Sequence, residues 1–252
     1  MRSSVFLRRA LAALALLLGT LVPVTGARAE VWLIASQDNF PPYNYTLKGK
    51  RTGLDAEIVD TVLKRIGALP VHQAVNWLEV VESLEKDKID LAFQFVARPD
   101  RFEKFHMIGP VRTGETVLMA RADSDITFDT LEDLKGVPIG YIQGFSYTPE
   151  FDAAEYLEKV PASGELSNIR RLVMGRVDLV IGDLHTLTYF ADQEAKLAKV
   201  KILPKTLGLI PRYFAIPKSR AEKARRFQAA FEEIRSDGTL DEIITRWRTK
   251  QP

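Results

Sequence analysis

The chain has 252 residues, with 35 lysines and arginines against 33 aspartates and glutamates, and contains no cysteine. Without cysteine there is no disulfide, thiolate metal site or lipid-anchored N-terminal cysteine. The nearly balanced charge, without basic blocks, excludes an electrostatic footprint for nucleic acid or anionic lipid.

The first 29 residues predict a secretory signal peptide. A basic start, the apolar run LAALALLLG and the sequence ARA before Glu30 have the expected order. The apolar run is too short to span a membrane. The segment holds four arginines and no acid, so residues 30–252 carry 31 basic against 33 acidic residues, a net charge of −2. We expect a soluble periplasmic protein without a lipid anchor.

Strands alternate with helices along the first half of the mature chain. An apolar run at 31–35 predicts a strand, and apolar residues at helical spacing predict a helix over 54–66. A strand at 71–75, a helix that begins at Trp77 and a buried strand at 89–95 follow. This βαβαβ order predicts a parallel sheet with helices on both faces.

The alternation restarts after the polar stretch RADSD. Asp129 and Glu132 predict a capping box for a short helix. A strand at 137–142, a helix within 164–175 and a strand at 177–183 predict a second α/β unit. Two helices, in 219–238 and 239–247, end the pattern.

Two such units define where a ligand would bind. Open parallel sheets bind ligands outside the carboxyl ends of their strands, and two facing sheets would share one cleft. The loops expected there are 36–46, 76–78, 94–101, 143–149 and 183–186.

The motif order FPPYNY, NW, IDLAF, RPDR, DLKGVPIGYIQG, GRVDLVIGD and SDGTLDEI resembles that of the family-3 periplasmic solute-binding proteins. These are polar amino-acid receptors of ABC importers. The resemblance spans nearly the whole mature chain, and implies a two-lobed type II α/β fold that closes around its ligand. We expect lobe 1 at 30–118 plus 213–252 and lobe 2 at 119–212, with crossings near 119–123 and 209–213. It further implies a monomer without cofactor and an inner-membrane ABC permease as partner.

Two charged residues match the family's positions for a zwitterion. Arg101 falls where relatives hold the ligand carboxylate, and a guanidinium suits this group because its planar fork pairs with two oxygens. Asp183 falls where relatives hold the ligand ammonium. The alternatives are a solvated surface arginine and a helix N-cap, which Asp183 could combine with ligand binding.

Two aromatic residues match the walls of the family's pocket. Phe40 falls where an aromatic ring covers the ligand side chain, and Trp77 falls near its partner on the opposite side. Such a pair would bury an apolar or planar group, or hold a cation by its π faces. The alternative for Trp77 is ordinary core, because Val80 and Leu84 share its helical face.

The sequence departs from the family's pattern in the second lobe. Relatives follow the glycine matched by Gly144 with a threonine, whereas this chain has Phe145. Ser146 could replace the missing hydroxyl. Free backbone N–H groups at the helix start that follows would attract a carboxylate.

Further departures affect the ligand. Val96 replaces a hydroxyl that touches the ligand in many relatives, and Arg98 replaces a threonine. Gln94 could still offer a hydrogen bond. Arg98 could add a positive charge to the site or point to solvent, and we expect solvent.

The residues argue against an enzyme. His72, His106 and His185 lack metal-ligand spacing, so we expect no metal site and no catalytic residue. Cyclohexadienyl dehydratase has the same fold, and a relative of that enzyme would need Asp183 or Glu115 as its proton-transfer acid. A ligand sensor module is a third possibility.

Overall fold

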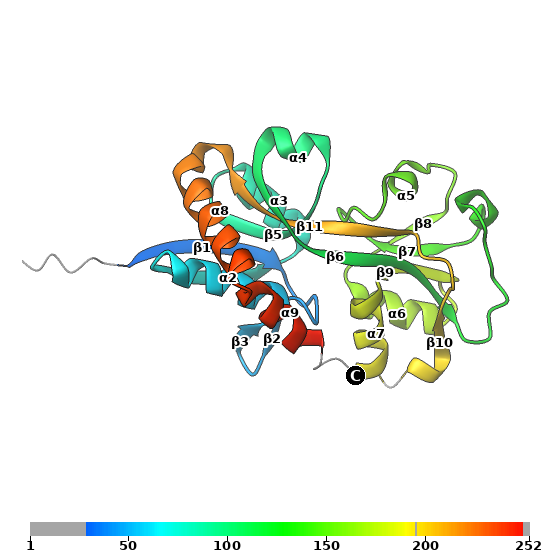
Figure 1. Ribbon diagram of the computed structural model, residues 1–252. Helices are drawn as coiled ribbons and strands as arrows, with labels where there is room; N and C mark the ends of the chain where they lie inside the picture. The colour runs from blue at the N-terminus through cyan, green and yellow to red at the C-terminus, as the bar shows by residue number, and fades with distance from the viewer. Residues whose placement is uncertain (1–28, 195, 249–252) are drawn as a thin grey trace, which may run out of the picture.

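A computed structural model describes residues 29–194 and 196–248, so the predicted signal peptide, except for its last residue, lies outside the described chain. Two α/β lobes share one continuous sheet (Figure 1). Within the described ranges this sheet has nine strands in the order β4-β1-β5-β11-β6-β9-β7-β8, with β10 paired to β6. The predicted α/β class is confirmed.

The first lobe contains the predicted βαβαβ unit, in which β1 pairs in parallel with both β4 and β5. A small hairpin interrupts the connection from β1 to α2, and two long helices complete the lobe. The elements are β1 (Glu30–Gln37), β2 (Tyr45–Leu47), β3 (Lys50–Thr52), α2 (Leu54–Arg65), β4 (Ala68–Val75), α3 (Trp77–Glu85), β5 (Leu91–Val96), α4 (Pro99–Lys104), α8 (Ala221–Ser236) and α9 (Thr239–Arg248).

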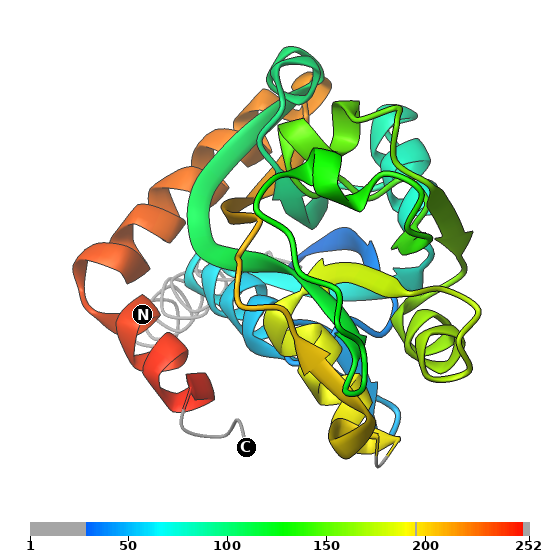
Figure 2. The ribbon, with the colours of Figure 1, turned by 90° about the vertical axis from the view of Figure 1, so that its right-hand side faces the viewer.

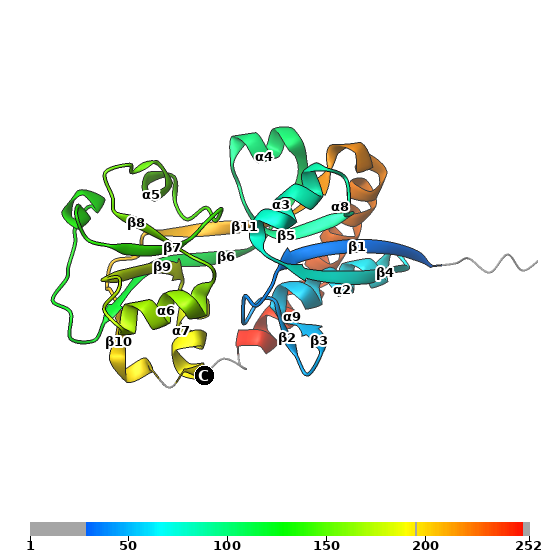
Figure 3. The same ribbon diagram turned by 180° about the vertical axis from the view of Figure 1, so that it is seen from behind.

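Helices cover both faces of this sheet. Helices α2, α8 and α9 pack on one face, where Phe227 lies 6.0 Å from the ring centroid of Trp32 and 5.0 Å from that of Phe214. Helix α3 packs on the other face, where Trp77 meets Phe95. Figure 3 shows α3 and α2 on opposite sides of the strands, and Figure 2 shows α8 and α9 along one side of the molecule.

The second lobe has parallel β7, β8 and β9, with α6 and α7 on one face and α5 on the other. The predicted capping box is shifted by one residue, because Thr130 and Asp133 form it, around a 3-10 turn. The sequence analysis did not predict β8. The elements are η1 (Leu131–Leu134), β7 (Ile139–Ile142), α5 (Pro149–Ala153), β8 (Lys159–Ala162), α6 (Glu165–Val173), β9 (Leu179–Asp183), α7 (Leu184–Gln193), η2 (Leu197–Lys199) and β10 (Val200–Ile202).

Two antiparallel strands, β6 (Phe105–Arg121) and β11 (Gly208–Pro217), run side by side between the lobes (Figure 1). Strand β6 pairs with β9 of the second lobe from Thr116 onward. This strand therefore changes lobe before the segment 119–123 where the sequence analysis places the crossing. The β11 register shifts just after Arg212, at the position where this strand also begins to pair with β5. The lobe boundaries themselves stay a prediction.

A buried ion pair ties helix α2 to the crossing strand β6. Arg112 donates to both carboxylate oxygens of Asp55, at 2.7 and 2.9 Å, and the two side chains are only 6% and 4% exposed. A two-pronged pair of this kind fixes the approach of the two elements. Removal of one partner would leave the other charge buried and uncompensated.

We expect Asp55→Ala to lower the free energy of unfolding by about 3 to 5 kcal/mol, measured by urea denaturation. The matched control is Glu82→Ala, which breaks a pair with Lys86 whose side chains are both more than half exposed. This control should change stability far less than Asp55→Ala, because exposed ion pairs contribute little. Equal small effects of the two substitutions would contradict a structural role for the buried pair.

Candidate functional site

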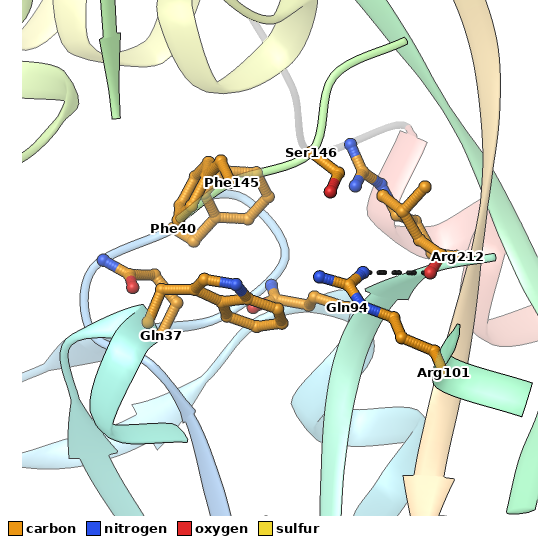
Figure 4. A pocket seen from close by; sticks show the side chains of 9 residues that line it. Gln37, Phe40, Gln94, Arg101, Phe145, Ser146 and Arg212 are labelled. Carbon is orange, nitrogen blue, oxygen red and sulfur yellow. Dashed lines mark hydrogen bonds between the residues drawn. The ribbon is translucent and has the colours of Figure 1, made fainter. Parts of the chain in front are cut away.

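A small cavity of about 30 Å³ lies between the lobes, at the carboxyl ends of β1, β5 and β7 (Figure 4). Its lining residues are Gln37, Phe40, Trp77, Gln94, Val96, Arg101, Phe145, Ser146 and Arg212. Five of the seven predicted ligand residues lie together here: Phe40, Trp77, Gln94, Arg101 and Ser146. Gly144 and Asp183 do not line it. We call this space the arginine compartment.

Arg101 is a buried cation without an acidic partner. The residue is 7% exposed, which excludes the solvated surface arginine considered above. Its Nη1 donates to the carbonyl of Val96 at 2.9 Å, and it forms no ion pair with any residue of 29–194 or 196–248. Burial, with a smaller effect of the neighbouring Arg98, lowers the pKa of Arg101 to about 10. A guanidinium in this state is suited to bind an anion.

Arg98 lies at the edge of the arginine compartment. Its side chain is 49% exposed and pairs with Asp100 at 3.0 Å, so it is partly solvated as expected. Its Nη1 also donates to the hydroxyl of Ser146 at 3.2 Å. This hydrogen bond joins α4 of the first lobe to the loop after β7 of the second.

Gln94 carries both strain and unmet hydrogen bonds. Its φ is +72°, in the left-handed region that non-glycine residues rarely adopt. Both polar atoms of its amide are buried without a partner in the described chain, as is the indole Nε1 of Trp77. Such groups cluster where a ligand supplies the missing partners.

Three aromatic rings meet between the lobes. Phe145, from the second lobe, lies edge-on to Phe40 at 6.1 Å and to Trp77 at 5.9 Å, measured between ring centroids. Trp77 also packs in the same core cluster as Val80 and Leu84 and lines the cavity, while its role as a wall for the ligand stays a prediction. Phe145 thus contacts both predicted walls, and Figure 4 shows it beside Phe40.

Gly144 shapes the backbone that presents Phe145. Its φ is +84°, and a Cβ added to it would lie 2.5 Å from Cδ2 of Leu78. The left-handed backbone favours glycine, and a Cβ at this position would also force the side chain of Leu78 to shift. Its place outside the lining favours a conformational role.

Asp183 lies at the crossing strands. Its Oδ1 accepts from the backbone N–H groups of His185 and Thr186, which confirms the helix N-cap alternative for α7. A Cβ added to Gly114 of β6 would lie 2.7 Å from Oδ2 and 3.4 Å from Nε of Arg212. Asp183 is therefore close to Arg212, which lines the arginine compartment, whereas Asp183 does not.

Charged and polar groups gather at this crossing. The guanidinium carbon of Arg112 lies 3.3 Å from the ring centroid of Tyr43. Burial and then Asp183 raise the pKa of Tyr43 above its ordinary value. Burial by itself lowers the pKa of Arg112, but Asp55 and Tyr43 together raise it by more than burial lowers it, so the net shift is upward. Burial and the neighbouring Arg112 lower the pKa of Arg212.

The lobes touch each other across the cleft. Thr186 of α7 donates its hydroxyl to the carbonyl of Pro41 at 2.8 Å, and both residues are buried. The rings of Tyr45 and Tyr189 meet further out, with centroids 6.0 Å apart. The structure is thus a closed arrangement of the two lobes.

A second cavity of about 400 Å³ lies on the other side of Phe145. Glu165, the first residue of α6, lines it, and is 5% exposed with both carboxyl oxygens lacking a hydrogen-bond partner in the described chain. Burial, followed by the influence of Asp183, raises the pKa of Glu165 to about 8. We call this space the glutamate compartment.

Sequence reasoning missed four cleft residues: Gln37, Phe145, Glu165 and Arg212. Three of them lie in or next to regions that it had selected, namely the loops 36–46 and 143–149 and the crossing 209–213. A charged residue within an apolar strand was the available signal for Arg212. Glu165 carried no such signal, because the strand before it was not predicted.

The acids that a dehydratase-like enzyme would need do not line the arginine compartment. Glu115 accepts a hydrogen bond from the hydroxyl of Thr206 at 2.6 Å, and Asp183 lies near Arg212 outside the lining. Across the part of the chain that the structure describes, no cluster of three or more histidines and acids could hold a metal ion. In the same residues, no helix is long and apolar enough to cross a membrane.

The fold and the cleft define a two-lobed ligand receptor. The sequence matches the bacterial extracellular solute-binding proteins, family 3, over residues 33–250, and the chain belongs to this family. The L-cystine-binding protein TcyA of Bacillus subtilis is 26% identical, over 86% of this chain and 81% of that protein. A probable amino-acid ABC transporter-binding protein of Haemophilus influenzae is 24% identical, over 87% and 85%.

Solved structures support the same fold. The P235GK mutant of ArgBP from T. maritima superposes with a TM-score of 0.78, over 87% of this chain and 96% of that one. The two sequences are 22% identical, so this likeness concerns the fold alone. The predicted family and fold class are confirmed by these comparisons.

Glu165 should make stability depend on pH. The folded protein keeps this proton up to about pH 8, whereas the unfolded chain releases it near the ordinary value of 4.5. Stability from this group is therefore complete below pH 4.5 and is lost as the pH rises to about 8, at up to about 1.4 kcal/mol per pH unit.

Urea denaturation of the protein and of Glu165→Gln between pH 5 and pH 8 measures this effect. The free energy of unfolding of the unchanged protein should decrease relative to that of the variant as the pH rises. Parallel curves for the two proteins would show that the carboxyl group is ionised in the folded state throughout.

Proposed function

We propose that this protein is a periplasmic receptor that captures an amino acid or a close derivative between its lobes and delivers it to an ABC importer. The relatives are an L-cystine-binding protein and a probable amino-acid ABC transporter-binding protein. Capture of a zwitterion agrees with the cleft, and delivery is inferred from the relatives alone.

The observation that carries the proposal is the unpaired Arg101. A buried arginine normally has a carboxylate partner, because a lone buried charge is costly. Among the residues that the structure describes, Arg101 has one side-chain hydrogen-bond partner, the carbonyl of Val96, and it lies in a cavity between lobes that can separate. The carboxylate of an amino acid would supply the missing partner, and its binding would favour lobe closure.

Arg101→Ala should weaken binding by about 2 to 4 kcal/mol, because the ligand carboxylate would lose its charged partner. The ligand is first identified by measuring thermal unfolding in the presence of each of the twenty amino acids and of cystine. A ligand at a hundred times its Kd increases the free energy of unfolding by about 2.7 kcal/mol. Calorimetry with the best amino acid then compares the variants. Mass spectrometry should recover that amino acid unchanged after incubation.

Arg101→Lys is the matched control. It keeps the charge and loses the planar fork, so its affinity should lie between those of the unchanged protein and Arg101→Ala. Unchanged affinity in both variants would remove Arg101 from the site. Consumption of the ligand would favour an enzyme.

The predicted ammonium contact of Asp183 remains part of the proposal. Since Asp183 lies near Arg212 but does not line the cavity, an ammonium would reach this carboxylate only after a rearrangement of the cleft. Asp183→Asn should weaken binding of the amino acid more than binding of the 2-hydroxy acid with the same side chain, as measured by calorimetry. Equal losses for the two compounds would identify Asp183 as a helix cap and interlobe residue only.

A further inference from the structure

The arginine compartment is too small for the ligand as it stands. A cavity of about 30 Å³ holds two or three water molecules, at roughly 10 to 15 Å³ each. Gln37, Phe40 and Phe145 line both this cavity and the cavity of about 400 Å³ beside it. Phe145 therefore divides a single cleft in two, and a ligand at Arg101 needs the ring to move.

The position of Phe145 allows this movement. The ring is half-buried, and it follows the exposed Gln143 and Gly144. Its neighbours are the edges and faces of other rings, with Tyr147 at 6.3 Å between centroids, and no polar group holds it. The larger cavity next to it offers room for a displaced ring and for the far end of a ligand.

The glutamate compartment has the polarity of a site for N–H groups. Both oxygens of Glu165 and the Oε1 of Gln37 are buried acceptors without partners in the described residues. Asp38, paired with Arg51 at 3.3 Å, adds a carboxylate to the same lining. An acid at a helix start is common for structural reasons, but a capping role would show as a hydrogen bond from a backbone N–H, and Glu165 accepts none.

We propose that the ligand site continues past Phe145 into the glutamate compartment, where Glu165 binds a terminal ammonium or guanidinium of an extended amino acid. This inference rests on the proposed function, because Arg101 must hold the other end. It assigns the ligand to a class: an amino acid whose side chain ends in a cation.

Glu165 can ionise for such a ligand at neutral pH. Since its pKa is about 8, ionisation at pH 7 reduces affinity by about tenfold. A charge-assisted hydrogen bond increases affinity by about ten- to a hundredfold. The bound ligand also gives the buried carboxylate a partner that it otherwise lacks. The titratable groups recorded near Glu165 are Asp183, Tyr147 and Asp38.

Lysine and norleucine provide a matched pair of probes, because they differ only in the terminal amino group. By calorimetry at pH 7, the unchanged protein should bind lysine up to about tenfold more tightly than norleucine, because the gain of the charge-assisted hydrogen bond is reduced by the cost of ionising Glu165. Glu165→Gln keeps the size of the side chain and should reduce this ratio to below about threefold. Glu155→Gln, at an exposed position of the same lobe, should leave the ratio unchanged.

Phe145→Ala tests the division of the cleft separately. Because the ring would no longer have to be displaced, the affinities for lysine and norleucine should both rise severalfold, with their ratio unchanged. A fall in both affinities would show that the ring is part of the binding wall, and would overturn its role as a divider.

The outcomes separate this inference from the proposed function. A ratio for lysine over norleucine that is the same in Glu165→Gln and the unchanged protein would overturn the assignment of Glu165. Tight binding of short neutral amino acids, with no preference for lysine, would overturn the assignment of the ligand to amino acids with a cationic side chain. The proposed function as an amino-acid receptor would still stand. Binding of no amino acid at all would overturn both.

Discussion

The burial of two arginines at the crossing of the lobes is the constraint on which the closed structure depends. Arg112 and Arg212 face each other across β6 and β11, where like charges in a poorly hydrated place repel. Asp55 of the first lobe compensates Arg112 in every arrangement of the lobes, because it lies on α2 of that lobe. The acid next to Arg212 is Asp183, which belongs to the second lobe. Within the described residues Oδ2 of Asp183 and Nε of Arg212 have no hydrogen-bond partner, so Asp183 offsets part of the Arg212 charge by proximity and does not pair with it.

The ligand then acts on an equilibrium that the protein already biases. Contacts such as the hydrogen bond from Thr186 to Pro41 favour closure without a ligand, whereas the unpaired Arg101 opposes it, since closure removes this cation from water. When an anion binds Arg101, the cation gains a charged partner in the closed cleft, so its burial no longer opposes closure. Affinity thus depends on the free-energy difference between the closed protein with ligand and the closed protein without it. Phe145 contributes to this difference because its ring occupies the ligand's space in the closed protein without ligand.

The alternation of strands and helices could be predicted from periodicity, because apolar spacing reflects burial along each element. Arg101 and Phe40 could be placed by motif order, which identifies the loops at the strand ends. The direction of the Phe145 side chain could not, since it depends on the left-handed backbone at Gly144 and on Leu78 from the other lobe. Glu165 was missed because β8 is a short edge strand with a proline, which local patterns describe poorly.

The opposite polarities on the two sides of Phe145 would also fix the direction in which a ligand enters. Arg101 attracts a carboxylate and repels an ammonium, and the acceptors around Glu165 do the reverse. A ligand turned end for end would place two carboxylates together on one side and two cations on the other, each pair with little water to screen it. Selectivity in such a cleft arises as much from the rejected orientation as from the accepted one. A largely aromatic cleft could in this way discriminate between amino acids of similar size. The rings limit the size of the ligand, and Arg101 and Glu165 select the charges at its two ends.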